Sequence, residues 1–165
     1  MKKVILGVVM ALVASLIPAT VSAQDMVQYS SNTGFSCLVP ATASEVPADG
    51  AVAVVTPDQE FTVTAIPVEG DALNEEIITG IMKTMADAAE MDLAKAEPID
   101  LENKTIEGTL YMQVKENGMV AAVGLVGLSE GNQAFFITLV ASPNYVKAVD
   151  AVLKSMEYNG EAVKP

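Results

Sequence analysis

The chain has 165 residues, with nine basic and 21 acidic residues and a formal net charge of −12. It contains no histidine, arginine or tryptophan and only one cysteine. This composition excludes imidazole catalysis, guanidinium clamps, cysteine zinc clusters and an internal disulfide. The acidic charge argues against nucleic-acid binding and favours a soluble monomer.

The first 23 residues are typical of a secretory signal peptide. Lys2 and Lys3 precede an apolar run from Val4 to Ile17, and the small residues 21–23 suit signal peptidase. The run is shorter than the roughly 20 residues that cross a bilayer, although a retained N-terminal anchor is the alternative. We therefore expect cleavage after Ala23 and export to the periplasm or the extracellular space. Loss of both lysines would lower the net charge from −12 to −14.

The remaining chain predicts a flexible leader at 24–33, one domain at 34–160 and a C-terminal tail at 161–165. Residues 34–40, "GFSCLVP", alternate in polarity, which predicts a strand with Cys37 as a small buried hydrophobe. Residues 41–50 are rich in small and polar residues and predict a loop. The turn signal "PDQ" at 57–59 separates two apolar segments, 51–56 and 60–68, which predicts a hairpin.

The hydrophobic period then changes to that of a helix. Leu73, Ile77, Ile81 and Met85 recur every four residues, so we expect an amphipathic helix within 71–91, capped by Asp71. Residues 106–114, "IEGTLYMQV", alternate again and precede the Asn-Gly turn signal of "KENG".

The most apolar mature stretch, residues 118–142, predicts a hairpin. A membrane helix would bury the polar segment 129–132, where a charged residue costs about 2.5–3.5 kcal/mol at the bilayer centre. We therefore expect no transmembrane span in the mature chain. Both faces of the hairpin are apolar, so the second face is either covered within the monomer or exposed to a ligand or partner. A final helix is predicted from Pro143, with Ser142 as its cap.

This order predicts an α+β fold, in which an antiparallel sheet of about five to six strands carries two helices on one face. The segments "GFSCLVP" (34–40), "IEGTLYMQV" (106–114) and "QAFFITLVASPNYVKAVDAVLKSM" (133–156) resemble the opening strand and the closing strands and helix of the PsbP/Mog1/DcrB-like family of small α+β domains. A tryptophan common after the opening strand in some members is absent here. The resemblance implies a binding or accessory role and supplies no catalytic residue.

We therefore expect an exported, non-enzymatic binding or accessory protein without a cofactor, whose partner is a protein or a small molecule. The candidate binding surface is the polar face of 106–114 with Thr109, Tyr111 and Gln113, beside Thr62 and Thr64; an ordinary solvated sheet face is the alternative reading.

Two further classes stay open. One is a hydrolase that uses only carboxylates and hydroxyls. The other is a metal-binding protein, with Ca²⁺ near the carboxylate pairs or Cu(I) near the methionine thioethers. The residues considered are Asp58 with Glu60, Glu69 with Asp71, and Met82, Met85 and Met91. For these methionines, ordinary core packing is the favoured reading.

Overall fold

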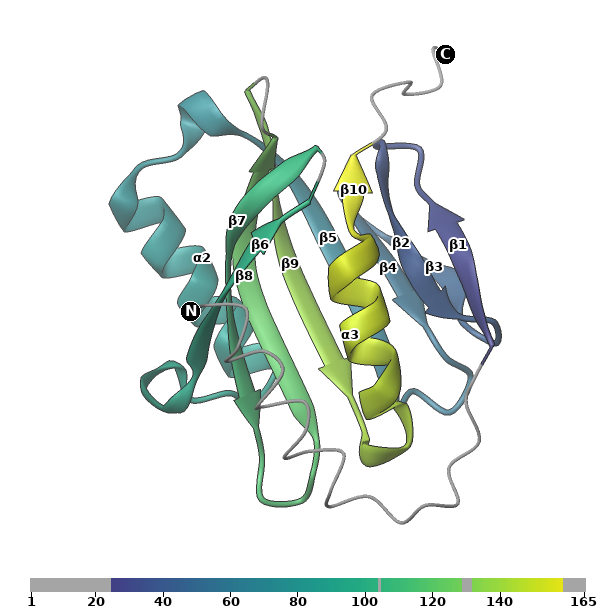
Figure 1. Cartoon of the computed structure of the whole chain (residues 1–165). Helices are drawn as coiled ribbons and strands as arrows, with labels where there is room; N and C mark the ends of the chain where they lie inside the picture. Colours follow the sequence, from purple (N-terminus) through teal and green to yellow (C-terminus); the bar gives the residue numbers. More distant parts are fainter. Residues whose placement is uncertain (1–24, 104, 129–131, 159–165) are drawn as a thin grey trace.

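The computed structural model describes residues 25–103, 105–128 and 132–158 (Figure 1). The predicted signal peptide, the predicted tail and residues 129–131 of the predicted turn lie outside these residues. The strands are β1 Met26–Ser30, β2 Phe35–Pro40, β3 Ser44–Ala48, β4 Ala51–Val55, β5 Phe61–Glu69, β6 Glu97–Glu102, β7 Ile106–Val114, β8 Val120–Leu128, β9 Gln133–Ala141 and β10 Glu157–Tyr158; the α-helices are α2 Glu75–Ala88 and α3 Val146–Ser155.

A seven-stranded antiparallel sheet forms the middle layer, in the order β3-β4-β5-β9-β8-β7-β6. The predicted hairpin of 118–142 is its β8–β9 pair, in register from Val120 opposite Ala141 to Gly127 opposite Ala134. Both strands are central, and their side chains are buried on both faces, as their continuous apolar sequence requires. The α+β class is confirmed, and the sheet is larger than the five to six strands predicted.

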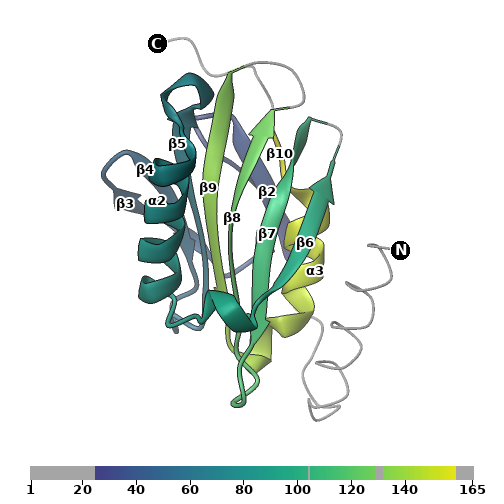
Figure 2. The ribbon, with the colours of Figure 1, turned by 90° about the vertical axis from the view of Figure 1, so that its left-hand side faces the viewer.

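The two helices lie on opposite faces of this sheet, so the prediction that they share one face is wrong (Figure 2). Helix α2 packs against Ala121, Val123 and Phe136 on one face. Helix α3 covers the other face, where Ile137 and Leu139 are fully buried, together with β2. The physical reason is that β8 and β9 are apolar on both sides, so each side needs its own cover. None of the helices in the described ranges has the length and apolar character needed to cross a membrane.

The extra strands come from segments expected to be irregular. Residues 26–30 of the predicted leader form β1, which pairs with β2 so that Tyr29 lies opposite Cys37. The predicted loop 41–50 contains β3, all of whose residues are exposed. A strand at the edge of a sheet need not alternate in polarity. Its backbone pairs with a neighbour along one border only, and few of its side chains are buried. A second sheet, β1-β2-β10, thus joins α3 in the outer layer.

Both edge strands of the seven-stranded sheet contain a proline and acidic residues. Strand β3 has Pro47 and Glu45, and β6 has Pro98 with Glu97, Asp100 and Glu102. Proline removes a backbone donor, and charges at an edge oppose pairing with another chain. Glu45 also accepts a 2.6 Å hydrogen bond from the Tyr29 hydroxyl of β1, which links the two sheets. Burial and this carboxylate raise the pKa of Tyr29.

Candidate functional site

The five predicted binding residues lie on the same face of the seven-stranded sheet, the face that carries α2. Cross-strand pairing places Tyr111 opposite Val123, which lies on the α2 side, and Thr64 opposite Thr138 of β9. Strands β8 and β9 separate β7 from β5, a distance of about 14 Å at the usual strand spacing. The structure therefore divides the predicted surface into two parts, Thr109, Tyr111 and Gln113 on β7, and Thr62 and Thr64 on β5.

A groove of about 550 Å³ lies beside the β7 part. One wall is α2, the other is the connector that follows α2, and Tyr111, which is 39% exposed, is its only lining residue from β7. The apolar lining residues are Ile78, Met82, Ala86, Met91, Leu93 and Ala94, and the polar ones besides Tyr111 are Thr79, Lys83, Asp87 and Asp92. A groove of this size and composition is typical of a small-molecule site.

Helix α2 is fixed at its N-terminus by Asn74 and not by Asp71 as predicted. The Asn74 side chain accepts a 2.9 Å hydrogen bond from the Ile77 backbone amide, whereas Asp71 belongs to the short 3₁₀ turn Gly70–Ala72. The carboxylates of Glu75 and Glu76 in the first turn favour the positive end of the helix dipole. Because the helix begins at Glu75, the apolar residues of α2 face β8.

The end of α2 shapes the groove. Glu90 has a positive φ of 53°, and the Met91 amide donates to the Ala86 carbonyl at 2.8 Å while the Glu90 amide donates to Asp87 at 3.1 Å. This pair of bonds is a Schellman motif, which reverses the chain and brings Met91 back onto Ala86. Both side chains then line the same groove.

Two side chains of the β7 region hold the connector in place. The Gln113 side-chain oxygen accepts a 2.8 Å hydrogen bond from the Asp92 amide, and the Lys115 ammonium donates to the Ala89 carbonyl at 2.9 Å. Gln113, predicted as a binding residue, therefore already positions the groove wall. The Thr109 hydroxyl likewise donates to Asp100 at 2.9 Å. Of the three predicted β7 residues, Tyr111 is the one that lines the groove.

The remaining groove residues could not be predicted from the sequence, because the period of a helical stripe does not show how much of the stripe the sheet covers. Met82 and Met91 were assigned to core packing, and both are buried within the cluster around Phe136. Met85 belongs to the same cluster. The usable signal was a methionine-rich helix flank followed by a connector that is also apolar, at Met91 and Leu93.

The first carboxylate pair considered for calcium, Asp58 and Glu60, has protein partners. Asp58 accepts hydrogen bonds from the hydroxyls of Thr56 and Tyr145, and these bonds lower its pKa, with that from Thr56 contributing most. Glu60 accepts from Ser142 and Asn144, each at 2.8 Å. These bonds tie the β4–β5 turn to the start of α3.

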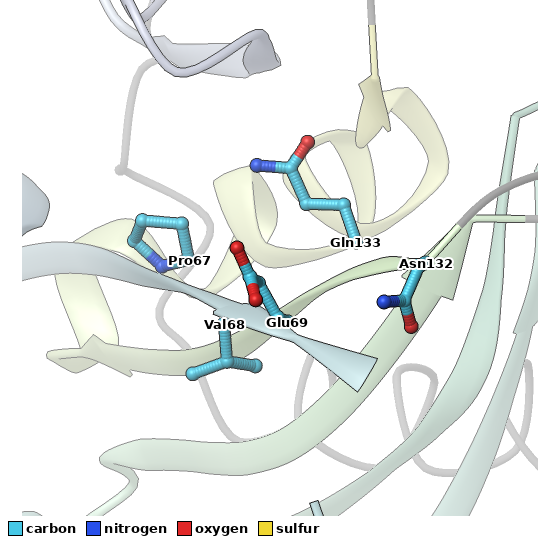
Figure 3. A pocket seen from close by; sticks show the side chains of 5 residues that line it. All are labelled: Pro67, Val68, Glu69, Asn132 and Gln133. Atoms are coloured by element: carbon cyan, nitrogen blue, oxygen red, sulfur yellow. The ribbon is translucent and has the colours of Figure 1, made fainter. Parts of the chain in front are cut away.

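Glu69, of the second carboxylate pair, borders another hollow of about 560 Å³, at the adjoining ends of β5 and β9. Its lining residues are Pro67, Val68, Glu69, Asn132 and Gln133. Figure 3 shows the Glu69 carboxylate and the Gln133 amide on one side of the strands and Val68 on the other. Asn132 accepts a 2.9 Å bond from the Asp71 amide. Across the described ranges, His, Cys, Asp and Glu residues form no group of three or more that could hold a metal ion.

Cys37 of β2 is fully buried within the large core cluster that also contains residues of α3 and of the seven-stranded sheet, as predicted. Burial raises the pKa of its thiol to about 12. The thiol therefore stays protonated near neutral pH and packs as an apolar group.

The fold of the chain is similar to that of PsbP. The solution structure of cyanobacterial PsbP from Synechocystis matches with a TM-score of 0.50 and 16% identity over 86% of this chain and 97% of that one. A crystal structure from Bacteroides thetaiotaomicron matches with a TM-score of 0.44 and 17% identity over 87% of this chain, which spans about half (52%) of that protein.

The chain thus has a PsbP-like fold, which confirms the resemblance suggested by its strand and helix order. At this level of identity the likeness concerns the fold alone. No protein-family model matches the chain. No curated protein matches its sequence.

Proposed function

We propose that this chain is an exported, non-enzymatic binding protein and that the groove between α2 and the connector that follows it, bordered by Tyr111 of β7, is its binding site. The observation that carries the proposal is the groove itself, an apolar concavity of about 550 Å³ with Tyr111 at its edge. Its walls are held by backbone hydrogen bonds and by Gln113 and Lys115, so it exists before a ligand arrives. Preformed sites bind without the cost of ordering their walls.

A binding role fits the chemistry of the lining better than a catalytic role. The groove residues include no imidazole or thiol, and the chain has no histidine. Asp92 already accepts from the Ala94 amide at 3.1 Å and pairs with Lys95 at 3.5 Å. General acid–base catalysis needs two groups with separated pKa values that both reach a substrate. Lys83 and Asp87 are exposed on α2, where water competes with any contact that their charges make.

The test is a ¹⁵N-labelled preparation of residues 24–165, titrated with a small-molecule library and followed by amide chemical shifts. We expect binders to shift amides confined to residues 78–94 and to the neighbourhood of Tyr111. The matched variants are Ala94→Trp, which adds a large side chain within the lining, and Ala88→Trp at an exposed position of α2 outside the lining. Ala94→Trp should abolish the shifts and Ala88→Trp should preserve them.

Two outcomes would overturn the proposal. One is binding that perturbs other regions and survives Ala94→Trp. The other is reproducible substrate turnover by the purified polypeptide, retained after dialysis against a metal chelator.

A further inference from the structure

The floor of the groove is apolar and deformable. Met82 and Met91 are 7% and 6% exposed and contribute two unbranched thioether side chains. Methionine adapts to ligands of different shape because its three side-chain torsions are soft and its sulfur is polarisable. Ile78, Leu93 and the two alanines complete the apolar floor. Binding of an apolar group that displaces water from such a surface is favourable.

The rim of the groove offers almost no net charge. Asp92 is held by the Ala94 amide and by Lys95, as described above. Lys83 and Asp87 form no ion pair with another described residue, and they stand four residues apart on α2, one of each sign. A charged ligand would therefore meet its counter-ion and a like charge together. Their contributions to its binding largely cancel.

The surroundings of the groove are acidic. On the β6–β7 hairpin, Asp100, Glu102 and Glu107 share the face of Tyr111, and Glu102 lies directly opposite Glu107. The whole chain carries a net charge of −12, so its field repels anions. A protein partner broad enough to bury about 800 Å² would also cover these carboxylates and have to desolvate them. A small molecule that stays within the groove avoids that cost.

From these observations, and resting on the proposed function, we infer that the ligand is an uncharged, largely apolar small molecule with one hydrogen-bonding end. Its apolar body lies on the methionine floor. Its polar end lies at the rim, where the hydroxyls of Tyr111 and Thr79 are in reach of solvent. The class includes long-chain alcohols and other neutral lipid-like compounds.

The test compares three ligands that share one apolar body. 1-Decanol, decanoate and decylammonium are titrated below their aggregation limits into labelled residues 24–165, and the amide shifts of residues 78–94 give each Kd. We expect decanol to bind at least tenfold tighter than either ion. Ala94→Trp should remove decanol binding, while Ala88→Trp should leave its Kd within twofold.

The outcomes separate this inference from the proposed function. Tighter binding of decanoate, weakened by Lys83→Gln, would show an anion site; tighter binding of decylammonium, weakened by Asp87→Asn, would show a cation site. Either result overturns the inference and leaves the binding role intact. If none of the three shifts the groove amides, the inference fails; if the wider library also leaves them unchanged, the proposed site fails with it. In that case a macromolecular partner is the next hypothesis.

Discussion

Replacing Gly124 with alanine should destabilise the protein strongly, because β7 and β8 approach each other too closely there for a side chain. A Cβ at this position would lie 2.7 Å from the Leu110 Cα and 2.8 Å from its Cδ2, and closer still to the Thr109 carbonyl oxygen. Two of these three atoms belong to the backbone of a paired strand, so relief requires the strands to separate. Overpacking costs about 1–3 kcal/mol where side chains can shift, and we expect the upper end here, about 3 kcal/mol.

The assay is thermal and urea unfolding of residues 24–165, followed by circular dichroism. For a domain of this size, about 3 kcal/mol corresponds to a fall in Tm of about 6–12 °C. Gly80→Ala is the matched control, because a Cβ there has no neighbour within 4 Å and the site is mid-helix in α2. The control should gain about 1 kcal/mol from helix propensity. A Gly124→Ala protein within 0.5 kcal/mol of the wild type would refute the close approach of β7 and β8.

Three further results are expected. Because hydrogen bonds lower the pKa of Asp58 in the folded state, its stabilising effect is present above its unfolded pKa and is lost as pH falls through the lower folded value. Asp58→Asn should therefore flatten the acid limb of stability below that unfolded pKa, and an unchanged limb would contradict the cause. Cys37, with its pKa raised to about 12, should resist a thiol-specific disulfide reagent at pH 8 until denaturant is added, and rapid labelling of the folded chain would contradict its burial. Glu90→Gly should stabilise the protein by roughly 1 kcal/mol in urea titrations, since glycine adopts the positive φ of 53° freely, and a loss of stability would contradict the Schellman geometry.

The elements with strong periodicity were predictable from the sequence. The alternation in 106–114 and the continuous apolar strands of 118–142 identified β7, β8 and β9, because burial on one or both faces leaves a direct trace in residue order. The placement of the helices was not predictable in the same way. The apolar stripe of a helix shows that one side of the helix is buried. It does not show which face of the sheet the helix packs against.

The weakly patterned elements were missed for a physical reason. All five residues of β3 are exposed, and β1 includes three exposed residues of five, so backbone pairing and not burial defines them. At the site, alternation correctly placed Tyr111 and Gln113 on one face. It could not reveal that Gln113 is bonded to Asp92, 21 positions away, because that contact depends on where the helix ends.

The prolines and carboxylates of β3 and β6 bear on how the protein behaves when it is concentrated. Half of the sequence (51%) is hydrophobic, and a sheet of seven strands offers two lateral borders from which a fibril could grow. Each border lacks one backbone donor, at Pro47 or Pro98, and repels a copy of itself through acidic side chains. The protection is therefore partly electrostatic, and a salt concentration high enough to screen those carboxylates would leave the two prolines as the remaining barrier to lateral assembly.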